Sequence, residues 1–158
     1  MKPDSKTPTP EAQVRSFINR FEPKDQKLFR SVRAALRKRF PTANELAYDY
    51  GHAIVISYSP TDGGIDGIVA ISARATGVAL YFNQGPQLPD PKKLLRGLGK
   101  RTRFIQVEAA GQLANPDVKA MIAAAINQAK IPLPSQGKGK LIIRGAAAKP
   151  RPSRKPTK

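Results

Sequence analysis

The strongest constraint on the fold is a series of short segments with period-two alternation and β-branched residues, which begins after Gly51. Residues 53–58, 65–74, 78–82 and 103–107 each have the composition of a strand, and turn-forming residues separate the first three. Parallel neighbours need crossover connections of a dozen or more residues, so the short connections favour antiparallel pairing. These segments predict an antiparallel sheet of about four strands.

Helical periodicity precedes and follows the predicted strands. Thr9 and Pro10 are placed to begin a first helix, Pro23 can begin a second one that Pro41 ends, and Asn115 can cap a last one. The second helix has an apolar stripe and a basic remainder. The stripe consists of Leu28, Val32, Ala35, Leu36 and Phe40, and the basic side chains, expected to face solvent, are Lys27, Arg30, Arg33, Arg37 and Lys38. With a short helical piece expected at residues 91–95, the pattern predicts an α+β fold in which two N-terminal helices and one C-terminal helix pack on the sheet.

The length of 158 residues suits a single domain. We expect a disordered lead-in over residues 1–10, a folded domain over 11–130, and a basic Pro/Ala/Lys-rich disordered tail over 131–158, in which the apolar residues 141–143 could dock on the domain. No segment approaches the ~18 apolar residues of a membrane span, and the first residues have no apolar leader. These features predict a cytoplasmic protein with no membrane partner.

The basic residues are segregated along the chain. The formal net charge is +17, from 28 Lys and Arg against 11 Asp and Glu, and the region from residue 131 onward has no acidic residue at all. Extended basic arms and clustered cations bind phosphate backbones without sequence preference. The candidate anion or nucleic-acid contacts are Lys92, Lys93, Arg96, Lys100, Arg101 and Arg103 in the domain, with Lys149, Arg151, Arg154, Lys155 and Lys158 in the tail.

The chain lacks the residues that several kinds of catalytic and metal sites require. The chain has no Cys and a single His, His52, which excludes thiolate nucleophiles, Cys-ligated metal sites and paired histidines. Gly97, Gly99 and Lys100 are arranged somewhat like a phosphate loop, but Arg101 replaces the required Ser or Thr and a strand follows, so the glycines indicate a turn. We expect no cofactor and no catalysis.

Aromatic residues are few. They make up 6% of the chain, Trp is absent, and filling the core leaves little for a stacking surface. Tyr48 and Tyr50 flank Asp49 and are candidates to line a pocket between the sheet and the helices.

One part of the chain resembles a known family. The stretch from Gln87 to Ile105 contains a Leu-Pro-Asp-Pro step, a Leu-Leu-Arg-Gly-Leu-Gly-Lys element and an Arg that leads into the next strand. It resembles the signature of the YdhG-like family, also described as domain of unknown function 1801. Phe82 and Gly85, Glu45, the segment 48–51 and the closing helix at 115–129 also resemble that family, and the resemblance covers residues 11–130.

The resemblance implies the same order of elements but only a limited function, because most of this family has no assigned activity. One branch is named as a frataxin-like intracellular iron chaperone, and such iron binding relies on clustered carboxylates. Here the sheet region has only Asp62, Asp66 and Asp90. We therefore expect a non-catalytic binding module that contacts nucleic acid or another polyanion, with an iron chaperone or small-ligand carrier as the alternative.

Overall fold

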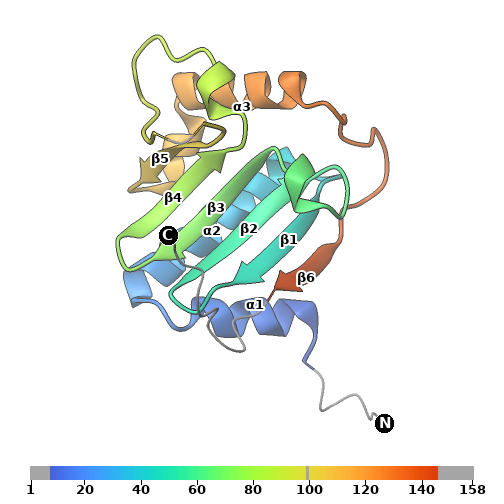
Figure 1. Cartoon of the computed structure of the whole chain (residues 1–158). Helices are drawn as coiled ribbons and strands as arrows, with labels where there is room; N and C mark the ends of the chain where they lie inside the picture. The colour runs from blue at the N-terminus through green and yellow to red at the C-terminus, as the bar shows by residue number, and fades with distance from the viewer. Residues whose placement is uncertain (1–7, 99, 146–158) are drawn as a thin grey trace, which may run out of the picture.

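The computed structural model describes residues 8–98 and 100–145. The described residues form an α+β fold with one six-stranded sheet (Figure 1). In chain order the elements are α1 (Pro10–Ile18), α2 (Pro23–Arg39), β1 (Asn44–Asp49), β2 (Ala53–Ser59), the 3-10 turn η2 (Gly64–Asp66), β3 (Val69–Arg74), β4 (Gly77–Phe82), η3 (Gly85–Gln87), β5 (Arg103–Val107), η4 (Ala110–Ala114), α3 (Pro116–Gln128) and β6 (Leu141–Gly145). None of these described helices is long and apolar enough to cross a membrane.

The strand order is β5-β4-β3-β2-β1-β6. Consecutive strands from β1 to β5 pair antiparallel, as the short connections predicted. The sheet as a whole is mixed, because β6 pairs with β1 in parallel, with Glu45 opposite Leu141 and Ala47 opposite Ile143. The prediction of about four antiparallel strands is therefore correct for β2 to β5 and omits the two strands β1 and β6.

The strand β6 lies in the segment that we expected to be a disordered tail. A Cβ atom on Gly139 would overlap the carbonyl oxygen of Ala43, so only glycine permits this approach. The Asn44 side chain then accepts a hydrogen bond from the Lys140 N–H at 3.0 Å, and the Glu45 N–H donates to the Lys140 carbonyl at 2.8 Å. These contacts start the strand, so residues 141–145 belong to the sheet and the prediction of disorder is wrong for them.

Another local prediction is also wrong. Residues 91–95 form a turn and not a helical piece, because Lys93 has a φ of 57°. The Asp90 carboxylate accepts hydrogen bonds from the Leu94 N–H at 2.7 Å and the Leu95 N–H at 2.9 Å. A side chain that captures backbone donors in this way competes with helix formation.

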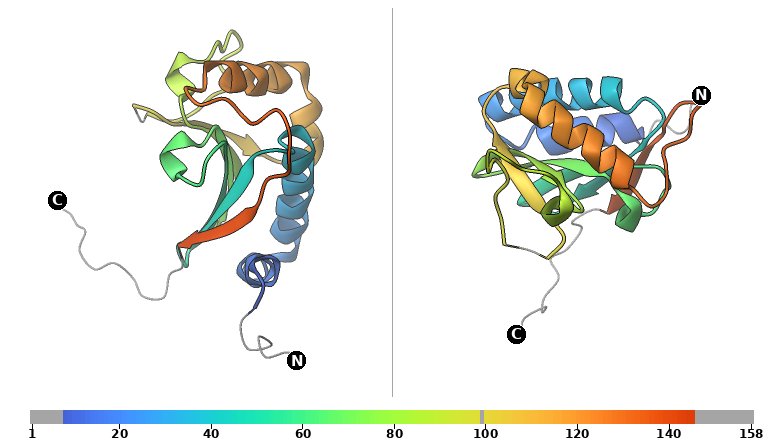
Figure 2. Two further views of the ribbon diagram at one scale, coloured as in Figure 1. Left: turned by 90° about the vertical axis from the view of Figure 1, so that its right-hand side faces the viewer. Right: turned by 90° about the horizontal axis from the view of Figure 1, so that it is seen from above.

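The α-helices cover one face of the sheet, and on the other face lies only the short 3-10 turn η2 among the described helical elements (Figure 2). The core between them contains Phe29, Val32 and Leu36 of α2, packed against alternate residues of the strands such as Ile56 and Ile71. Burying a side chain of this size stabilises the fold by about 1.5–3 kcal/mol. The caps of α1 and α3 are as predicted, since Thr9 accepts from the Ala12 N–H and Asn115 from the Asp117 N–H.

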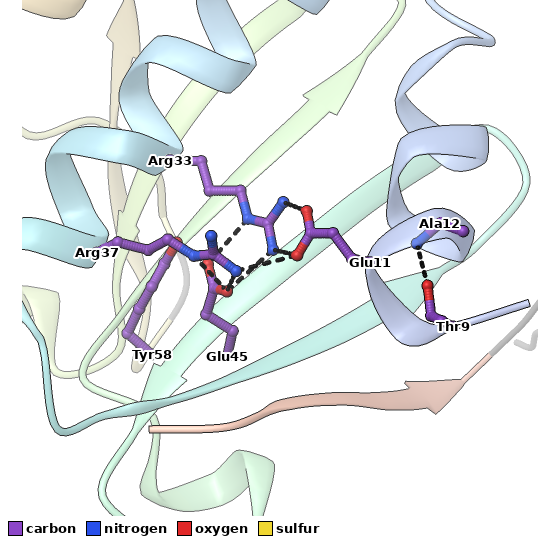
Figure 3. A network of polar contacts seen from close by, with 7 residues as sticks. All are labelled: Thr9, Glu11, Ala12, Arg33, Arg37, Glu45 and Tyr58. Atoms are coloured by element: carbon purple, nitrogen blue, oxygen red, sulfur yellow. Dashed lines mark hydrogen bonds and ion pairs between the residues drawn. The ribbon is translucent and has the colours of Figure 1, made fainter. Parts of the chain in front are cut away.

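A buried network of charged side chains joins α1, α2 and β1 (Figure 3). Arg33 of α2 is only 7% exposed, although its position predicted a solvent-facing side chain, and Glu45 of β1 is 5% exposed. The Arg33 guanidinium donates to Glu45 at 2.9 and 3.0 Å and to Glu11 of α1 at 2.7 and 3.2 Å. Arg37 and the Tyr58 hydroxyl also donate to Glu45, at 2.9 and 2.6 Å. Every polar atom of the Glu45 carboxylate is thereby satisfied inside the fold.

We expect Glu45→Gln to destabilise the protein by about 3 kcal/mol, because the substitution removes the buried charge partner of Arg33 and leaves it only the exposed carboxylate of Glu11. Urea unfolding at pH 7 measures this change. Glu22→Gln is the matched control, since Glu22 is exposed and makes no side-chain capping bond, and it should shift the free energy of unfolding by no more than about 0.5 kcal/mol. A loss below about 1 kcal/mol for Glu45→Gln would contradict a structural role for the network.

Candidate nucleic-acid interface

The six candidate cations of the domain lie on one loop, which we call the basic hairpin (residues 92–103). Arg96 pairs with Phe104 through two backbone hydrogen bonds of 2.8 and 3.0 Å, so the two sides of the hairpin are fixed to each other. The Asp90 carboxylate accepts a backbone hydrogen bond in the first turn of the hairpin. Near its other end, the Gly85 N–H donates to the Arg101 carbonyl at 3.0 Å. Leu94 and Leu95 are half-buried against the core. The loop is therefore anchored at both ends and projects from the side of the sheet that lacks α-helices (Figure 2, left).

The structure separates the six cations into two groups. Lys92 forms an ion pair with Asp117 at 3.1 Å, and Arg103 is half-buried, with its stem against Gly85 and its Nη1 donating to the Thr102 carbonyl. The second group consists of Lys93, Arg96, Lys100 and Arg101, which are all exposed and form no ion pair with any described residue. Four cations without carboxylate partners on one anchored loop make a positive surface suited to an anion.

The tip of the basic hairpin is apolar. Leu98 is 99% exposed, and Gly97 adopts a φ of +111° that favours glycine. Gly97 also lies close to the Phe104 ring, which a Cβ atom would approach to 3.5 Å. These glycine-dependent features support the interpretation of this segment as a turn.

A hollow of about 240 Å³ adjoins the hairpin between η2, the residues after β4 and the end of α3. Arg101 lines it together with polar side chains that include Asn83, Gln87 and Gln128. Two exposed apolar side chains, Ile65 and Ile131, also line it. Its volume is below the ~300–1,000 Å³ of ordinary small-ligand sites, so the hollow extends the surface of the hairpin and does not enclose a ligand.

Tyr48 and Tyr50 do not lie between the sheet and the helices, where we expected them. Their rings stack on each other with centroids 5.9 Å apart and an interplanar angle of 6°. Tyr48 is on the face of β1 opposite to Glu45, whose side chain contacts α2, so the tyrosine pair is on the face without α-helices. Burial and the neighbouring Tyr48 raise the pKa of Tyr50, although the residue is 51% exposed.

Asp49 fixes the turn that follows Tyr48. Its carboxylate accepts hydrogen bonds from both terminal nitrogens of Arg20. It also accepts one from the Gly51 N–H at 2.8 Å. Burial raises the pKa of this carboxyl, but these donors outweigh burial and hold the pKa below its ordinary value of 3.8. His52, the single histidine, is exposed and contacts the Tyr50 carbonyl through Nδ1 at 3.1 Å.

The carboxylates considered for iron are dispersed. Asp66 accepts a hydrogen bond from the Thr61 hydroxyl at 2.7 Å, and Asp90 is occupied by backbone donors. Within the part of the chain that the structure describes, no group of three or more His, Cys, Asp or Glu residues is arranged to hold a metal ion. The tail cations Lys149, Arg151, Arg154, Lys155 and Lys158 lie outside the described residues.

The buried charge network has the geometry of a structural element. Burial raises the pKa of Glu45, yet the hydrogen bonds from Arg33 and Tyr58 keep it below the ordinary value of 4.5. Hydrogen bonds from Arg33 likewise lower the pKa of Glu11, and burial beside Glu45 raises that of Tyr58. Both carboxyls are ionised and the tyrosine is protonated at neutral pH, so none of these groups is poised to exchange a proton there.

No protein-family model, curated protein or solved structure matches this chain.

We expect stability to fall steeply as the pH drops below about 4.5. The pKa values of Glu45, Glu11 and Asp49 are lower in the folded chain, so the unfolded chain takes up protons first. Their contribution is complete above the ordinary carboxyl values and is lost as the pH falls through the folded values. Urea midpoints at pH 5.5, 4.5, 3.5 and 2.5 would show the decline, and Glu45→Gln should flatten it. A midpoint that stays constant down to pH 2.5 would contradict this coupling.

Proposed function

We propose that this protein is a non-catalytic binding module that contacts the phosphate backbone of nucleic acid through the basic hairpin. The observation that carries the proposal is the group Lys93, Arg96, Lys100 and Arg101, which are exposed on an anchored loop and form no ion pair with a described residue. A cation already paired with a carboxylate must lose that partner to bind phosphate, whereas these four exchange only water and counterions.

The position of the hairpin supports this proposal. The loop projects beyond the sheet, so its cations can reach a long polymer without steric interference from the helices (Figure 2). The basic residues at 149–158 add cations to the same chain and would strengthen binding without adding sequence preference. We also propose membership in the YdhG-like family, on the residues between Gln87 and Ile105 that resemble its signature.

We expect Lys93→Gln, Lys100→Gln and Arg101→Gln, combined in one variant, to weaken binding to a labelled 20-mer duplex. The slope of log affinity against log salt concentration should become shallower by about 0.9 for each cation that contacts a phosphate. Fluorescence anisotropy at four salt concentrations measures both quantities. The matched control is Lys24→Gln, Lys27→Gln and Lys38→Gln, which removes the same charge from exposed positions of α2. If both triple variants lose affinity equally, binding depends only on net charge and the hairpin is not the site.

The contribution of the tail is tested by a chain that ends at Gly145. Ending the chain at 135 would remove β6 and damage the sheet, whereas ending it at 145 keeps every described strand and removes only Lys149, Arg151, Arg154, Lys155 and Lys158 among the charged residues. We expect this shorter chain to bind the duplex more weakly and with a shallower salt slope, and to retain the sensitivity to the hairpin substitutions. Affinity unchanged by the truncation would assign binding to the hairpin alone.

A further inference from the structure

The side of the sheet opposite the helices, which we call the open face, has a recognisable order of side chains. The pairing registers place these side chains in rows across the strands. The first row is Ile142, Leu46, Ser57, Ala70, Tyr81 and Phe104, and the second is Tyr48, Val55, Ser72, Ala79 and Gln106. No α-helix among the described elements covers this face, but η2 lies over part of it: Cβ atoms on Gly64 and Gly67 would overlap the hydroxyls of Tyr48 and Ser57 (Figure 1, Figure 2).

Two aromatic pairs stand at opposite sides of the open face. Tyr81 of β4 and Phe104 of β5 lie with ring centroids 5.2 Å apart, and Tyr48 and Tyr50 form the second pair beside β6. From β4 to β1 there are three strand steps, which correspond to about 14 Å. Tyr48, Tyr81 and Phe104 are half-buried and Tyr50 is exposed, so all four rings retain surface for contact.

The floor between the two aromatic pairs is lined by small side chains and carries unsatisfied polar atoms. Ser57, Ala70, Ser72 and Ala79 occupy the central positions and are buried, and the residues after η2 pack on Ser57. Among the described residues, the buried side-chain atoms without a hydrogen-bond partner are Ser72 Oγ and Arg74 Nε. Both belong to β3, and both residues alternate with the core-facing Ile71 and Ala73, which places them on the open face. Ser72 is only 1% exposed.

The charged strand residues of the open face are all basic. Arg96 lies directly opposite Phe104 in an antiparallel bridge, so its side chain shares the face of Phe104 and Tyr81. Arg74 contributes a second guanidinium from β3. The acidic residues of the described strands are Glu45 and Asp49, and both point to the helix side, where they pair with Arg33 and Arg20. The open face therefore combines aromatic rings with cations and lacks strand carboxylates.

We infer that the open face binds single-stranded nucleic acid. Two or three unpaired bases stack on the pairs Tyr81–Phe104 and Tyr48–Tyr50, and the backbone between them passes over the second row, Val55, Ser72 and Ala79, towards Arg74 and Arg96. Stacking suits unpaired bases because their faces are accessible, and cations flanking the rings hold the phosphates. This inference deepens the proposed function and rests on it, because it names the class of nucleic acid. A base pair inside a duplex cannot offer its faces to the rings, so duplex contacts are left to the basic hairpin.

Tyrosine fluorescence of the full chain provides a direct test. Three of the four tyrosines are on the open face, and the fourth, Tyr58, is fully buried against Glu45. The chain has no Trp, so its emission reports tyrosine alone. We expect a 12-mer of oligo(dT) or oligo(U) to quench most of this emission, and a 12-base-pair duplex or inorganic polyphosphate to quench little. Binding of the 12-mers without quenching overturns the inference.

The matching variant is Tyr81→Leu with Phe104→Leu, which keeps apolar bulk but removes both rings. We expect the affinity for the 12-mers to fall roughly tenfold or more while duplex affinity changes less than about twofold. Phe17→Leu on α1 is the control, because Phe17 is half-buried on the helix side and should change neither affinity. Unfolding in urea verifies that each variant is folded. Tyr50→Leu removes an exposed ring and tests the same point independently if the double variant does not fold.

The outcomes separate the two proposals. Loss of single-strand binding with retained duplex binding supports the open face as the site. Unchanged single-strand binding in folded Tyr81→Leu/Phe104→Leu and in Tyr50→Leu overturns it while leaving the basic hairpin in place. If the unmodified chain binds neither the duplex nor the 12-mers, the proposed function fails and this inference fails with it.

Discussion

The arrangement of the helices on the sheet depends on the ion pair between Arg33 and Glu45. Removing two charges from water costs several kcal/mol for each ion, and the fold offsets this cost only because the carboxylate and the guanidinium each find several partners. The pair links α2 to β1, and Glu11 extends the link to α1. Apolar packing alone would tolerate several rotations of α2 over the sheet, whereas the planar fork of Arg33 fits both carboxylates in one orientation.

This constraint also determines which side of β1 is available to a ligand. With Glu45 and Asp49 directed to the helices, the alternation of the strand directs Tyr48 to the other side. The helix layer thus contains the acidic side chains of the strands, and the surface without α-helices is left to aromatic and basic groups. Because successive side chains of a strand point to opposite faces, the two faces of the sheet have different chemistry although every strand contributes to both.

Strands β2 to β5 were visible in the sequence because their inward residues are apolar and β-branched and their turns contain glycine. The strand β1 was missed because its inward residues include Glu45 and Asp49, so period-two hydrophobicity disappears where an ion pair replaces an apolar contact. Arg33 was assigned to solvent for the same reason, since a partner twelve residues away cannot be identified from periodicity. β6 is three apolar residues within a basic stretch, and only pairing with β1 makes it a strand.

The basic hairpin was predictable as a cluster of charges, but which of its cations are paired was not. Lys92 meets Asp117 across a tertiary contact, and Arg103 packs on Gly85, neither of which follows from spacing along the chain. The low aromatic content left little for a stacking surface. Pairing of β4 with β5, which are separated by twenty residues, nevertheless brings Tyr81 beside Phe104 on the face opposite the α-helices.

The parallel pairing of β6 with β1 has a consequence for how the chain is made. β1 is complete by Asp49, but its outer neighbour is not synthesised until Leu141, about ninety residues later. At the usual elongation rates of ~5–20 residues per second, the interval is roughly 5–20 s. During that time the outer edge of β1 has unpaired backbone groups that any other extended segment can join. Newly made copies emerging side by side on one messenger are therefore most exposed to mispairing at this edge, and the arrival of β6 ends that period.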